Sequence, residues 1–299
     1  MRTLRTIAEM KAALAQPRRA GRRIGLVPTM GAFHEGHLAL MRRARSECDE
    51  VIVSLFVNPT QFDDGTDLAA YPRDEERDAA IAAEQRVDYL FAPSPTEMYP
   101  EGFATTVSVG GITDVLEGAH RGRGHFEGVA TVVTKLFTIV TPDVAYFGQK
   151  DAQQTLVIKR LVRDLNLPVE IEICPTVREA DGLALSSRNQ RLAPDERASA
   201  TALSRSLAVA QALVAAGETD VATVLAAAHA ELEDPLIQTE YLHIVDPATL
   251  EPISSITGPA LALVAARVGR VRLIDNQTLS IDPTSSRPPV AAGSNTRSD

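Results

Sequence analysis

Short apolar runs alternate with helical segments along the first part of the chain. The runs typical of buried strands lie at 23–29, 50–59, 88–94, 143–149 and 169–174. Segments with helical spacing or helix-start signals lie between them, at 36–48, 72–86, 126–140 and 152–165. Strands that alternate with helices form βαβ units, whose strands are parallel and covered on both faces. The pattern therefore predicts an α/β domain over 1–176.

The character of the sequence changes after residue 176. A polar loop leads into a long alanine-rich helix, and a second helix is predicted around 220–232. Three further runs, TEYLHIVD, ALALVAARV and RVRLIDN, are typical of an antiparallel sheet. We therefore expect a smaller α+β domain over 177–281. The segment 282–299 has few apolar residues and several prolines, serines and glycines, which predicts a disordered tail.

Composition narrows the class of protein. The chain has 299 residues, a net charge of −9 and two cysteines without CxxC spacing. The negative charge argues against broad binding to nucleic acid or to an anionic membrane. The two cysteines favour thiols in a reducing compartment over a disulfide framework. Neither a run of 18 apolar residues nor a signal-peptide core is present, so we expect a soluble, cytoplasmic protein.

Two of the six histidines lie three residues apart in VPTMGAFHEGHLAL, just after the first predicted strand. Ligands bind such sheets outside the carboxyl ends of the strands. If a helix begins near Gly36, its free N–H groups form an anion site, where His34 and His37 could donate hydrogen bonds to one phosphate. A turn with solvent-facing histidines is one alternative. A metal site is another, but zinc usually needs three or four protein ligands and no third lies nearby in the sequence.

Four separated motifs carry a resemblance to a known family. The stretches LVPTMGAFHEGH, SLFVNPTQF, YFGQKD and PTVREADGLALSSRN occur in this order. Together they strongly resemble the pantothenate synthetases, the AMP-forming pantoate–β-alanine ligases of the H-x-G-H nucleotidyltransferase superfamily. The resemblance runs from about residue 23 to 280. It implies a Rossmann-like N-terminal domain, a smaller C-terminal lid domain that closes over ATP, a need for Mg²⁺, and a homodimer.

The resemblance also implies a reaction in two steps. Pantoate and ATP would form pantoyl adenylate and pyrophosphate, and β-alanine would then displace AMP to give pantothenate. No side chain needs to act as a nucleophile, so catalysis would come from orientation and charge stabilisation. His34, His37 and Lys150 would be the catalytic residues.

The residues that the resemblance assigns to ATP come from three of these motifs. Met30 and Val177 would contact the adenine through their backbones, Gly148 and Asp151 would bind the ribose, and the LSSR motif would bind the β- and γ-phosphates. The full set is Met30, Gly31, Ala32, Phe33, His34, Glu35, Gly36, His37, Gly148, Gln149, Lys150, Asp151, Val177, Leu185, Ser186, Ser187 and Arg188.

Polar amides are the candidates for binding pantoate. The resemblance implies that Gln61 and Gln154 hydrogen-bond this substrate, and Asn58 shares the loop of Gln61. Neutral amides would orient a carboxylate without a tight ion pair that reduces its nucleophilicity. Taken alone, FVNPTQF is an ordinary Asn-Pro turn and Lys150 is a solvated surface lysine.

Two segments depart from the family pattern. In YPRDEERD, Arg77 stands where the family has the first of two adjacent acids, which leaves Asp78 as the candidate Mg²⁺ ligand. An acid-rich helix N-terminus that binds no metal is the alternative. In RGRGHF, either Arg121 or Arg123 could take the role of the family arginine, and we expect His125 to be structural.

Other functions remain open from the residues alone. A metal-dependent hydrolase would use His34, His37 and His125 as ligands. A nucleotide-binding module would bind ATP without releasing pyrophosphate. A ligase acting on another carboxylic acid is the alternative within the superfamily.

Overall fold

The described chain divides into two units. The computed structural model describes residues 1–62 and 65–281. Contacts between Cα atoms divide the chain into a first unit, Met1–Ala193, and a second unit that begins at Pro194. The sequence placed this boundary after residue 176, whereas residues 177–193 fold back through a bridge between Arg178 and Ala184 and belong with the first unit. The predicted disordered tail, 282–299, lies outside the described residues.

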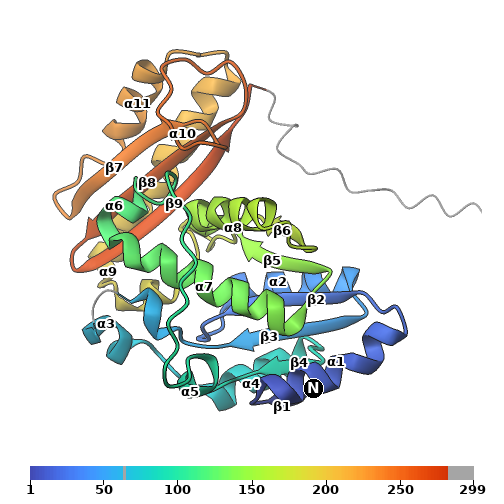
Figure 1. The fold of residues 1–299 in the computed structure, drawn as a ribbon. Coiled ribbons are helices and arrows are strands. Elements are labelled where there is room, and N and C mark those ends of the chain that lie inside the picture. The colour runs from blue at the N-terminus through green and yellow to red at the C-terminus, as the bar shows by residue number, and fades with distance from the viewer. Residues whose placement is uncertain (63–64, 282–299) are drawn as a thin grey trace, which may run out of the picture. The chain divides into compact units, whose positions relative to one another are not determined.

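A six-stranded parallel sheet forms the centre of the first unit (Figure 1). Its order is β1-β4-β3-β2-β5-β6, and every neighbouring pair is parallel. The strands are β1 (Arg2–Leu4), β2 (Ile24–Thr29), β3 (Glu50–Leu55), β4 (Tyr89–Phe91), β5 (Val144–Gly148) and β6 (Glu170–Cys174). The predicted α/β class and the five predicted strands are confirmed. β3 ends earlier than predicted because Asn58 and Pro59 begin a 3₁₀ turn, η1 (Pro59–Gln61).

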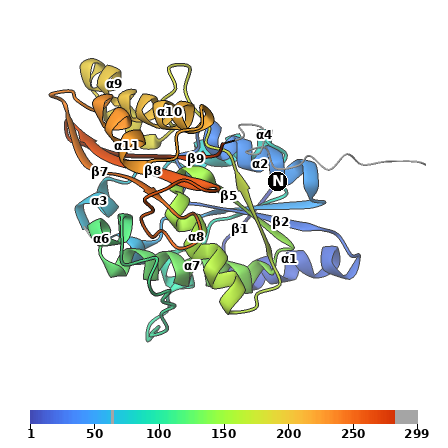
Figure 2. The ribbon, with the colours of Figure 1, turned by 90° about the horizontal axis from the view of Figure 1, so that it is seen from above.

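Helices cover both faces of this sheet, as Figure 2 shows. Side chains of α1, α7 and α8 pack on one face and those of α2 and α4 on the other. The helices of the unit are α1 (Ile7–Arg19), α2 (Glu35–Glu47), α3 (Gly65–Ala70), α4 (Glu75–Glu84), α5 (Pro95–Met98), α6 (Glu117–Arg121), α7 (Arg123–Val140) and α8 (Ala152–Asp164), with 3₁₀ turns η2 (Gln149–Asp151) and η3 (Ser187–Arg191). The neighbouring residues Leu26 and Val27 of β2 enter opposite clusters, which is why the strand is apolar at consecutive positions.

The sequence pattern did not predict β1 and α1. α1 nevertheless begins with a capping box, in which the Thr6 hydroxyl accepts from the Glu9 N–H and the Glu9 carboxylate accepts from the Thr6 N–H. The stretch TIAE carries the Thr-x-x-Glu signature of such a start. Met10 and Leu14, four residues apart on α1, are fully buried against the sheet. The helix could therefore have been found from its cap and its apolar spacing.

The second unit combines helices with an antiparallel sheet (Figure 1). Its helices are α9 (Pro194–Ala200), α10 (Ala202–Ala215) and α11 (Val221–Ala230), and its strands are β7 (Ile237–Val245), β8 (Ala260–Val268) and β9 (Val271–Leu279). The order is β7-β8-β9, and both pairs are antiparallel. The predicted α+β character of this part of the chain is confirmed. The central strand, β8, is buried at all positions but Arg267, as expected for a strand with a neighbour on each side.

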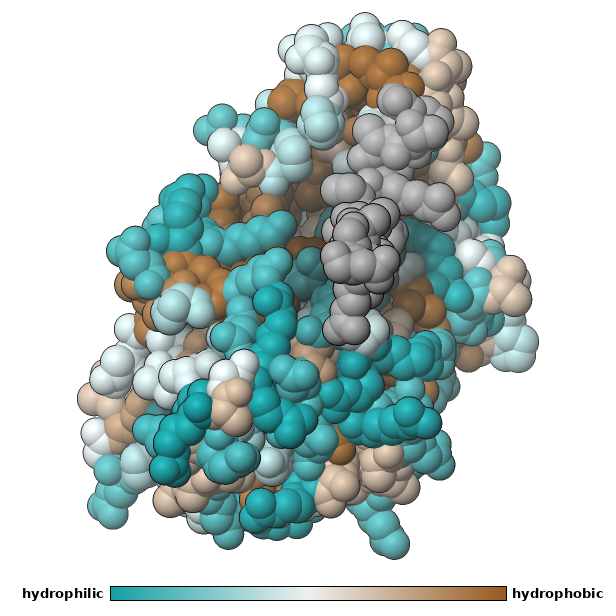
Figure 3. All heavy atoms as spheres, turned by 90° about the vertical axis from the view of Figure 1, so that its right-hand side faces the viewer, coloured by the Kyte–Doolittle hydropathy of each residue, from teal (hydrophilic) through white to brown (hydrophobic). Residues whose placement is uncertain are grey.

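Apolar side chains at the surface are dispersed. Five large hydrophobic residues are exposed in the described part of the chain: Met1, Val115, Leu165, Leu236 and Ile281. On the face that Figure 3 presents, hydrophilic residues cover much of the surface and apolar residues form small groups between them. Scattered exposed apolar residues of this kind are normal in folded proteins. Within the described ranges, we find no helix long and apolar enough to span a membrane.

We predict that Gly128→Ala destabilises the first unit. Gly128 lies in α7 against η1, and an added Cβ would come within 2.6 Å of the Thr60 carbonyl carbon and 2.7 Å of the Gln61 nitrogen. Backbone atoms cannot move aside as a side-chain tip can, so we expect the free energy of unfolding to fall by about 1–3 kcal/mol. Urea unfolding would measure this change.

Gly110→Ala is the matched control for this prediction. An added Cβ at Gly110 would meet no atom within 4 Å, so its unfolding free energy should stay within about 0.5 kcal/mol of the wild type. If Gly128→Ala instead stabilised the protein, by the roughly 1 kcal/mol that alanine contributes over glycine in a helix, close packing of α7 on η1 would be wrong.

Candidate active site

Three loops of the first unit follow the carboxyl ends of adjacent strands. β2 pairs with β3 on one side and with β5 on the other. The chain leaves β2 through α2 toward β3, and it reaches β5 through α7 on the opposite face of the sheet. This is the switch point where open parallel sheets bind ligands. All the predicted site residues belong to this unit.

His34 and His37 together cap the N-terminus of helix α2. Nδ1 of His34, the N-cap residue, accepts from the Gly36 N–H at 3.2 Å, and Nδ1 of His37 accepts from the His34 backbone N–H at 3.3 Å. An added Cβ on Gly36 would lie 2.9 Å from Cε1 of His34, so a larger residue here would displace the His34 ring. Because both Nδ1 atoms accept hydrogen bonds, both ring protons are assigned to Nε2. Each ring therefore presents an Nε2–H donor.

The surroundings keep both rings uncharged. Burial lowers the pKa of His37 to about 3, and the neighbouring His34 adds to this effect. Burial, followed by the charge of Lys150, also lowers the pKa of His34, while Asp151 opposes the change at both rings. The same interactions show that Lys150 and Asp151, in the loop after β5, lie near the two histidines. This part of the site offers neutral N–H donors beside a lysine.

The GQKD segment forms the end of β5 and the turn η2. The Lys150 side chain is only 19% exposed, and its Nζ lies 3.8 Å from Oδ1 of Asp151. It is therefore not the solvated surface lysine of the alternative interpretation. An added Cβ on Gly148 would meet no atom within 4 Å, so the backbone there borders open space.

Asn58 is a buried centre of hydrogen bonding. Its side chain is 1% exposed. Its Nδ2 donates to Oε1 of Gln61 at 3.0 Å and to the Gly128 carbonyl at 3.1 Å. Its Oδ1 accepts from the hydroxyls of Tyr99 and Thr60 at 2.8 and 2.9 Å. Protein groups thus occupy both of its donors and its acceptor oxygen, which leaves Asn58 to orient Gln61.

Gln61 is held at its backbone as well as at its amide. Its carbonyl oxygen lies 2.9 Å from Nδ1 of His125, and its Nε2 lies 3.1 Å from Sδ of Met30. The loops after β2 and β3 therefore adjoin at Gln61. The contact of His125 with a backbone carbonyl agrees with the structural role expected for it.

Two neighbouring glutamines of α8 differ in their surroundings. The side chain of Gln153 is buried, donates to the carbonyls of Ile112 and Val115, and accepts from the Glu117 N–H. It fixes the segment that leads into α6. Gln154, the predicted pantoate ligand, keeps partial exposure. Sequence reasoning missed Gln153, and only its distant backbone partners reveal its role.

The LSSR motif lies in a loop that is held by hydrogen bonds between its own residues. The Leu185 N–H donates to the Val177 carbonyl at 2.9 Å, and the Ser186 hydroxyl accepts from the Arg188 N–H at 3.3 Å. The Asn189 amide donates to the Ala184 carbonyl at 3.1 Å. The structure thus brings the predicted adenine contact and the predicted phosphate contacts into one folded loop after β6.

The described residues do not form a cage for a metal ion. Within 1–62 and 65–281, no three or more His, Cys, Asp or Glu side chains gather in a metal-binding arrangement. Asp78, the predicted ligand, is 1% exposed, and its two oxygens accept from the N–H groups of Ala32 and Phe33. These residues do not fit a protein-held Mg²⁺, and His34, His37 and His125 do not form the zinc site that a hydrolase would need.

The two candidate arginines differ in exposure. Nε of Arg121 lies 3.0 Å from Glu117 of α6, and the Arg121 side chain is 30% exposed. Arg123 begins α7, lies 3.7 Å from Asp114 and is 71% exposed. Arg123 is therefore the more accessible of the two guanidinium groups.

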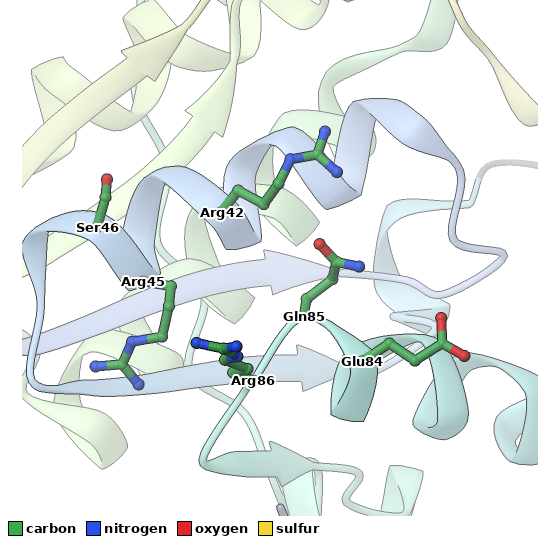
Figure 4. Close-up of a pocket in the computed structure, with 6 residues that line it drawn as sticks. All are labelled: Arg42, Arg45, Ser46, Glu84, Gln85 and Arg86. Carbon is green, nitrogen blue, oxygen red and sulfur yellow. The ribbon is translucent and has the colours of Figure 1, made fainter.

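A surface pocket lies apart from these loops (Figure 4). It has a volume of about 280 Å³ and is lined by Arg42, Arg45, Ser46, Glu84, Gln85 and Arg86. Arg42 forms an ion pair with Glu35, and Arg45 forms one with Asp88 at 2.6 Å. Because none of the predicted site residues lines this pocket, it is not part of the site at the carboxyl edge.

Both cysteines are free thiols, as predicted, and the structure buries both of them. Sγ of Cys48 lies 3.2 Å from the hydroxyl of Tyr146, and that hydroxyl donates to Glu47 at 2.9 Å. Burial raises the pKa of Cys174 to about 11. Neither thiol contributes to the predicted constellation.

We predict that His37 makes stability depend on pH between about 6 and 4. In the unfolded chain His37 takes up a proton near pH 6.5, whereas in the folded chain it does so only near pH 3. The unfolded state thus binds more protons in this window, so the free energy of unfolding falls as the pH is lowered, by up to about 1.4 kcal/mol per pH unit.

The His37→Gln variant serves as the reference for this prediction. It should show a shallower pH dependence in chemical unfolding at pH 6, 5 and 4, because glutamine does not titrate there. Parallel curves for the two proteins would contradict the neutral, buried state of His37.

Comparison with known proteins agrees with this geometry. The family model described as pantoate-beta-alanine ligase matches residues 2–278. The pantothenate synthetase of Moorella thermoacetica is 55% identical over 94% of this chain and 100% of its own length. That of Roseiflexus castenholzii is also 55% identical, over 92% of this chain and 98% of its own.

Solved structures give the same result. A crystal structure of pantothenate synthetase from Thermus thermophilus is similar with a TM-score of 0.88 and 51% identity, over 95% of this chain and 100% of that one. A pantoate–β-alanine ligase from Francisella tularensis, in complex with β-γ ATP and β-alanine, has a TM-score of 0.75 and 34% identity, over 93% of this chain and 97% of that one. The chain therefore belongs to the pantoate–β-alanine ligase family, whose reaction forms pantothenate from pantoate and β-alanine.

Proposed function

We propose that this ligase works through a pantoyl adenylate made from ATP. A carboxylate oxygen of pantoate attacks the α-phosphorus, the bond from that phosphorus to the bridging oxygen breaks, and pyrophosphate leaves. The β-alanine nitrogen then attacks the acyl carbon, the bond to the phosphate oxygen breaks, AMP leaves, and the nitrogen loses a proton. The observation that carries this proposal is the pair of neutral Nε2–H donors at the start of α2, within range of the charge of Lys150. The Francisella ligase in complex with β-γ ATP and β-alanine supports the choice of substrates.

In this proposal His34 and His37 bind the phosphates of ATP. Each donates through Nε2–H, and the dipole of α2 adds a favourable field for an anion at the N-terminus of this helix. Because the rings are neutral, they stabilise negative charge by directed hydrogen bonds that need no change of protonation. His37 donates to an oxygen on which charge builds up as pyrophosphate leaves.

Lys150 supplies the positive charge at the reacting centre. Its ammonium interacts with the α-phosphate and offsets the charge that two anions bring together when the carboxylate attacks. Asp151 and the Gly148 backbone bind the ribose. Met30 and Val177 contact the adenine.

The remaining ATP contacts come from the stretch Gly31–His37, Gln149 and the loop after β6. Within that stretch Ala32 and Phe33 keep the shape of the loop, because Asp78 already accepts from both of their N–H groups. In the loop after β6, Arg188 binds the β- and γ-phosphates, with hydroxyl donors from Ser186 and Ser187, because a guanidinium matches phosphate oxygens with two parallel hydrogen bonds. Leu185 shapes the same loop.

Pantoate lies against Gln61 and Gln154 in this proposal. The two amides fix the direction of its carboxylate without forming an ion pair. Asn58 orients Gln61 and does not bind pantoate itself, because its own amide is already bonded within the protein. The orientation of two reactants in this manner removes much of the entropic barrier to their reaction.

Further properties follow from the same family. We propose that Mg²⁺ arrives with the phosphates of ATP and keeps most of its waters, as this ion usually does. A homodimer and a cytoplasmic location complete the proposal, and the lid role of the second unit stays a prediction.

Pyrophosphate release tests the reaction and its order. With Mg²⁺ and ATP present, pyrophosphate should appear only when pantoate is added, and continued turnover to pantothenate and AMP should need β-alanine as well. Release with another carboxylic acid but not with pantoate would overturn the substrate. ATP binding without release for any acid would support the nucleotide-binding module instead.

We predict that His37→Ala and Lys150→Ala each lower the rate of pantoyl adenylate formation by about 100-fold or more, because each removes charge stabilisation in the transition state. Rapid-quench measurement of the adenylate, with circular dichroism to confirm the fold, would provide the test. Lys159→Ala is the control, since Lys159 is an exposed lysine of α8. Near-normal adenylate formation in either variant would refute the role given to that residue.

A further inference from the structure

Asp78 is buried and bonded to the loop that carries the two histidines. Its Oδ2 accepts from the Ala32 N–H at 2.7 Å, and its Oδ1 accepts from the Phe33 N–H at 2.9 Å. The residue is 1% exposed. A carboxylate held by two consecutive backbone N–H groups occupies an anion cradle of the kind that peptide turns form. These two N–H groups are thus bonded to Asp78 and are not available to a ligand.

The loop needs such support because of its backbone conformation. Gly31 and Ala32 have φ angles of 89° and 53°. Alanine disfavours the left-handed region and persists there only when its surroundings enforce it. An added Cβ on Gly31 would lie 2.8 Å from Oδ2 of Asp78 and 2.7 Å from Cδ1 of Leu55. The carboxylate and the loop are therefore in close contact at residues 31, 32 and 33.

Arg77 binds the next peptide group along the loop. Its Nη2 donates to the Phe33 carbonyl at 3.2 Å, and its Nη1 lies 3.7 Å from Oδ1 of Asp78. The Phe33 ring is 1% exposed within the core that α2 and α4 share. Both polar groups and the side chain of Phe33 are thus anchored. The next residue is His34, the N-cap of α2.

We propose that Asp78, with help from Arg77, is a positioning residue that sets the direction of the His34 and His37 rings, and that it is not a metal ligand. The N-terminus of α4 presents this pair to the loop, and the loop transmits its position to the two Nε2–H donors. The proposal rests on the phosphate-binding role given to these histidines. It also gives Arg77 a structural role at a position where the family has an acid.

Asp78→Asn provides the test, because asparagine keeps the size but places an NH₂ group against one of the two backbone N–H donors. We expect kcat for pyrophosphate release to fall by about 10- to 100-fold, as a small misplacement of catalytic groups does. The half-saturating Mg²⁺ concentration should change by less than about twofold. The amide protons of Ala32 and Phe33 should exchange faster, as measured by NMR.

Asp74→Ala is the matched control, because the Asp74 side chain caps α4 by accepting from the Arg77 N–H and does not contact the loop. It should lower the melting temperature while kcat stays within about twofold of the wild type. Recovery of wild-type kcat in Asp78→Asn at high Mg²⁺ would show a metal ligand and overturn the proposal. A wild-type kcat at ordinary Mg²⁺, or equal losses in the two variants, would overturn it as well.

A measurement on the wild type keeps the test valid if Asp78→Asn does not fold. The Ala32 and Phe33 amides should be protected from exchange in the protein treated with EDTA and free of ATP. If both exchange freely until Mg²⁺ is added, the hydrogen bonds from these two amides to Asp78 do not exist as proposed. This result is independent of whether the wild type releases pyrophosphate. A wrong assignment of the Asp78 hydrogen bonds can therefore be told apart from a wrong proposed function.

Discussion

The position of β2 between β3 and β5 determines where chemistry can occur in the first unit. Parallel strands end at the same edge of a sheet, and the connections from β2 to β3 and into β5 run over opposite faces. Nothing covers the gap between the two connections at the carboxyl edge of such a sheet, so loops line it there. Buried apolar side chains on both faces, such as Leu26 and Val27, fix this arrangement. The loops after β2, β3 and β5 then carry the histidines, the amides and Lys150 toward one another.

The two histidines that we propose to bind phosphate are also parts of the local structure. His34 and His37 satisfy backbone N–H groups at the start of α2. The hydrogen bonds that cap the helix use Nδ1, and this use leaves Nε2–H as the donor that a phosphate would meet. Capping thus requires the same tautomer that the proposed binding of phosphate would use. Gly36 belongs to the same helix cap, because a larger residue would collide with the His34 ring. The H-x-G-H spacing is therefore explained by helix geometry as well as by chemistry.

The sequence predicted those features that depend on neighbours in the chain. The buried strands, the amphipathic helices and the strand-end position of each motif followed from apolar runs and their spacing. The three-residue β1 was too short to give a pattern, and the loop 177–193 had no periodicity that would assign it to the first unit. Asp78, Asn58 and Gln153 each have a hydrogen-bond partner far along the chain, 46, 70 and 36 residues away respectively. No local pattern reveals such contacts, so the roles of these residues in holding loops emerged only from the fold.

These three buried polar residues share one physical logic. A buried amide or carboxylate costs free energy unless its donors and acceptors are paired. Asp78 pairs with the backbone of the loop after β2, Asn58 with Gln61 after β3 and with Gly128 of α7, and Gln153 with the segment before α6. Each buried group is satisfied only when its loop adopts one conformation, so the cost of an unpaired group selects that conformation. The precise placement of the Nε2–H donors therefore derives from polar groups outside the proposed contacts with the substrates.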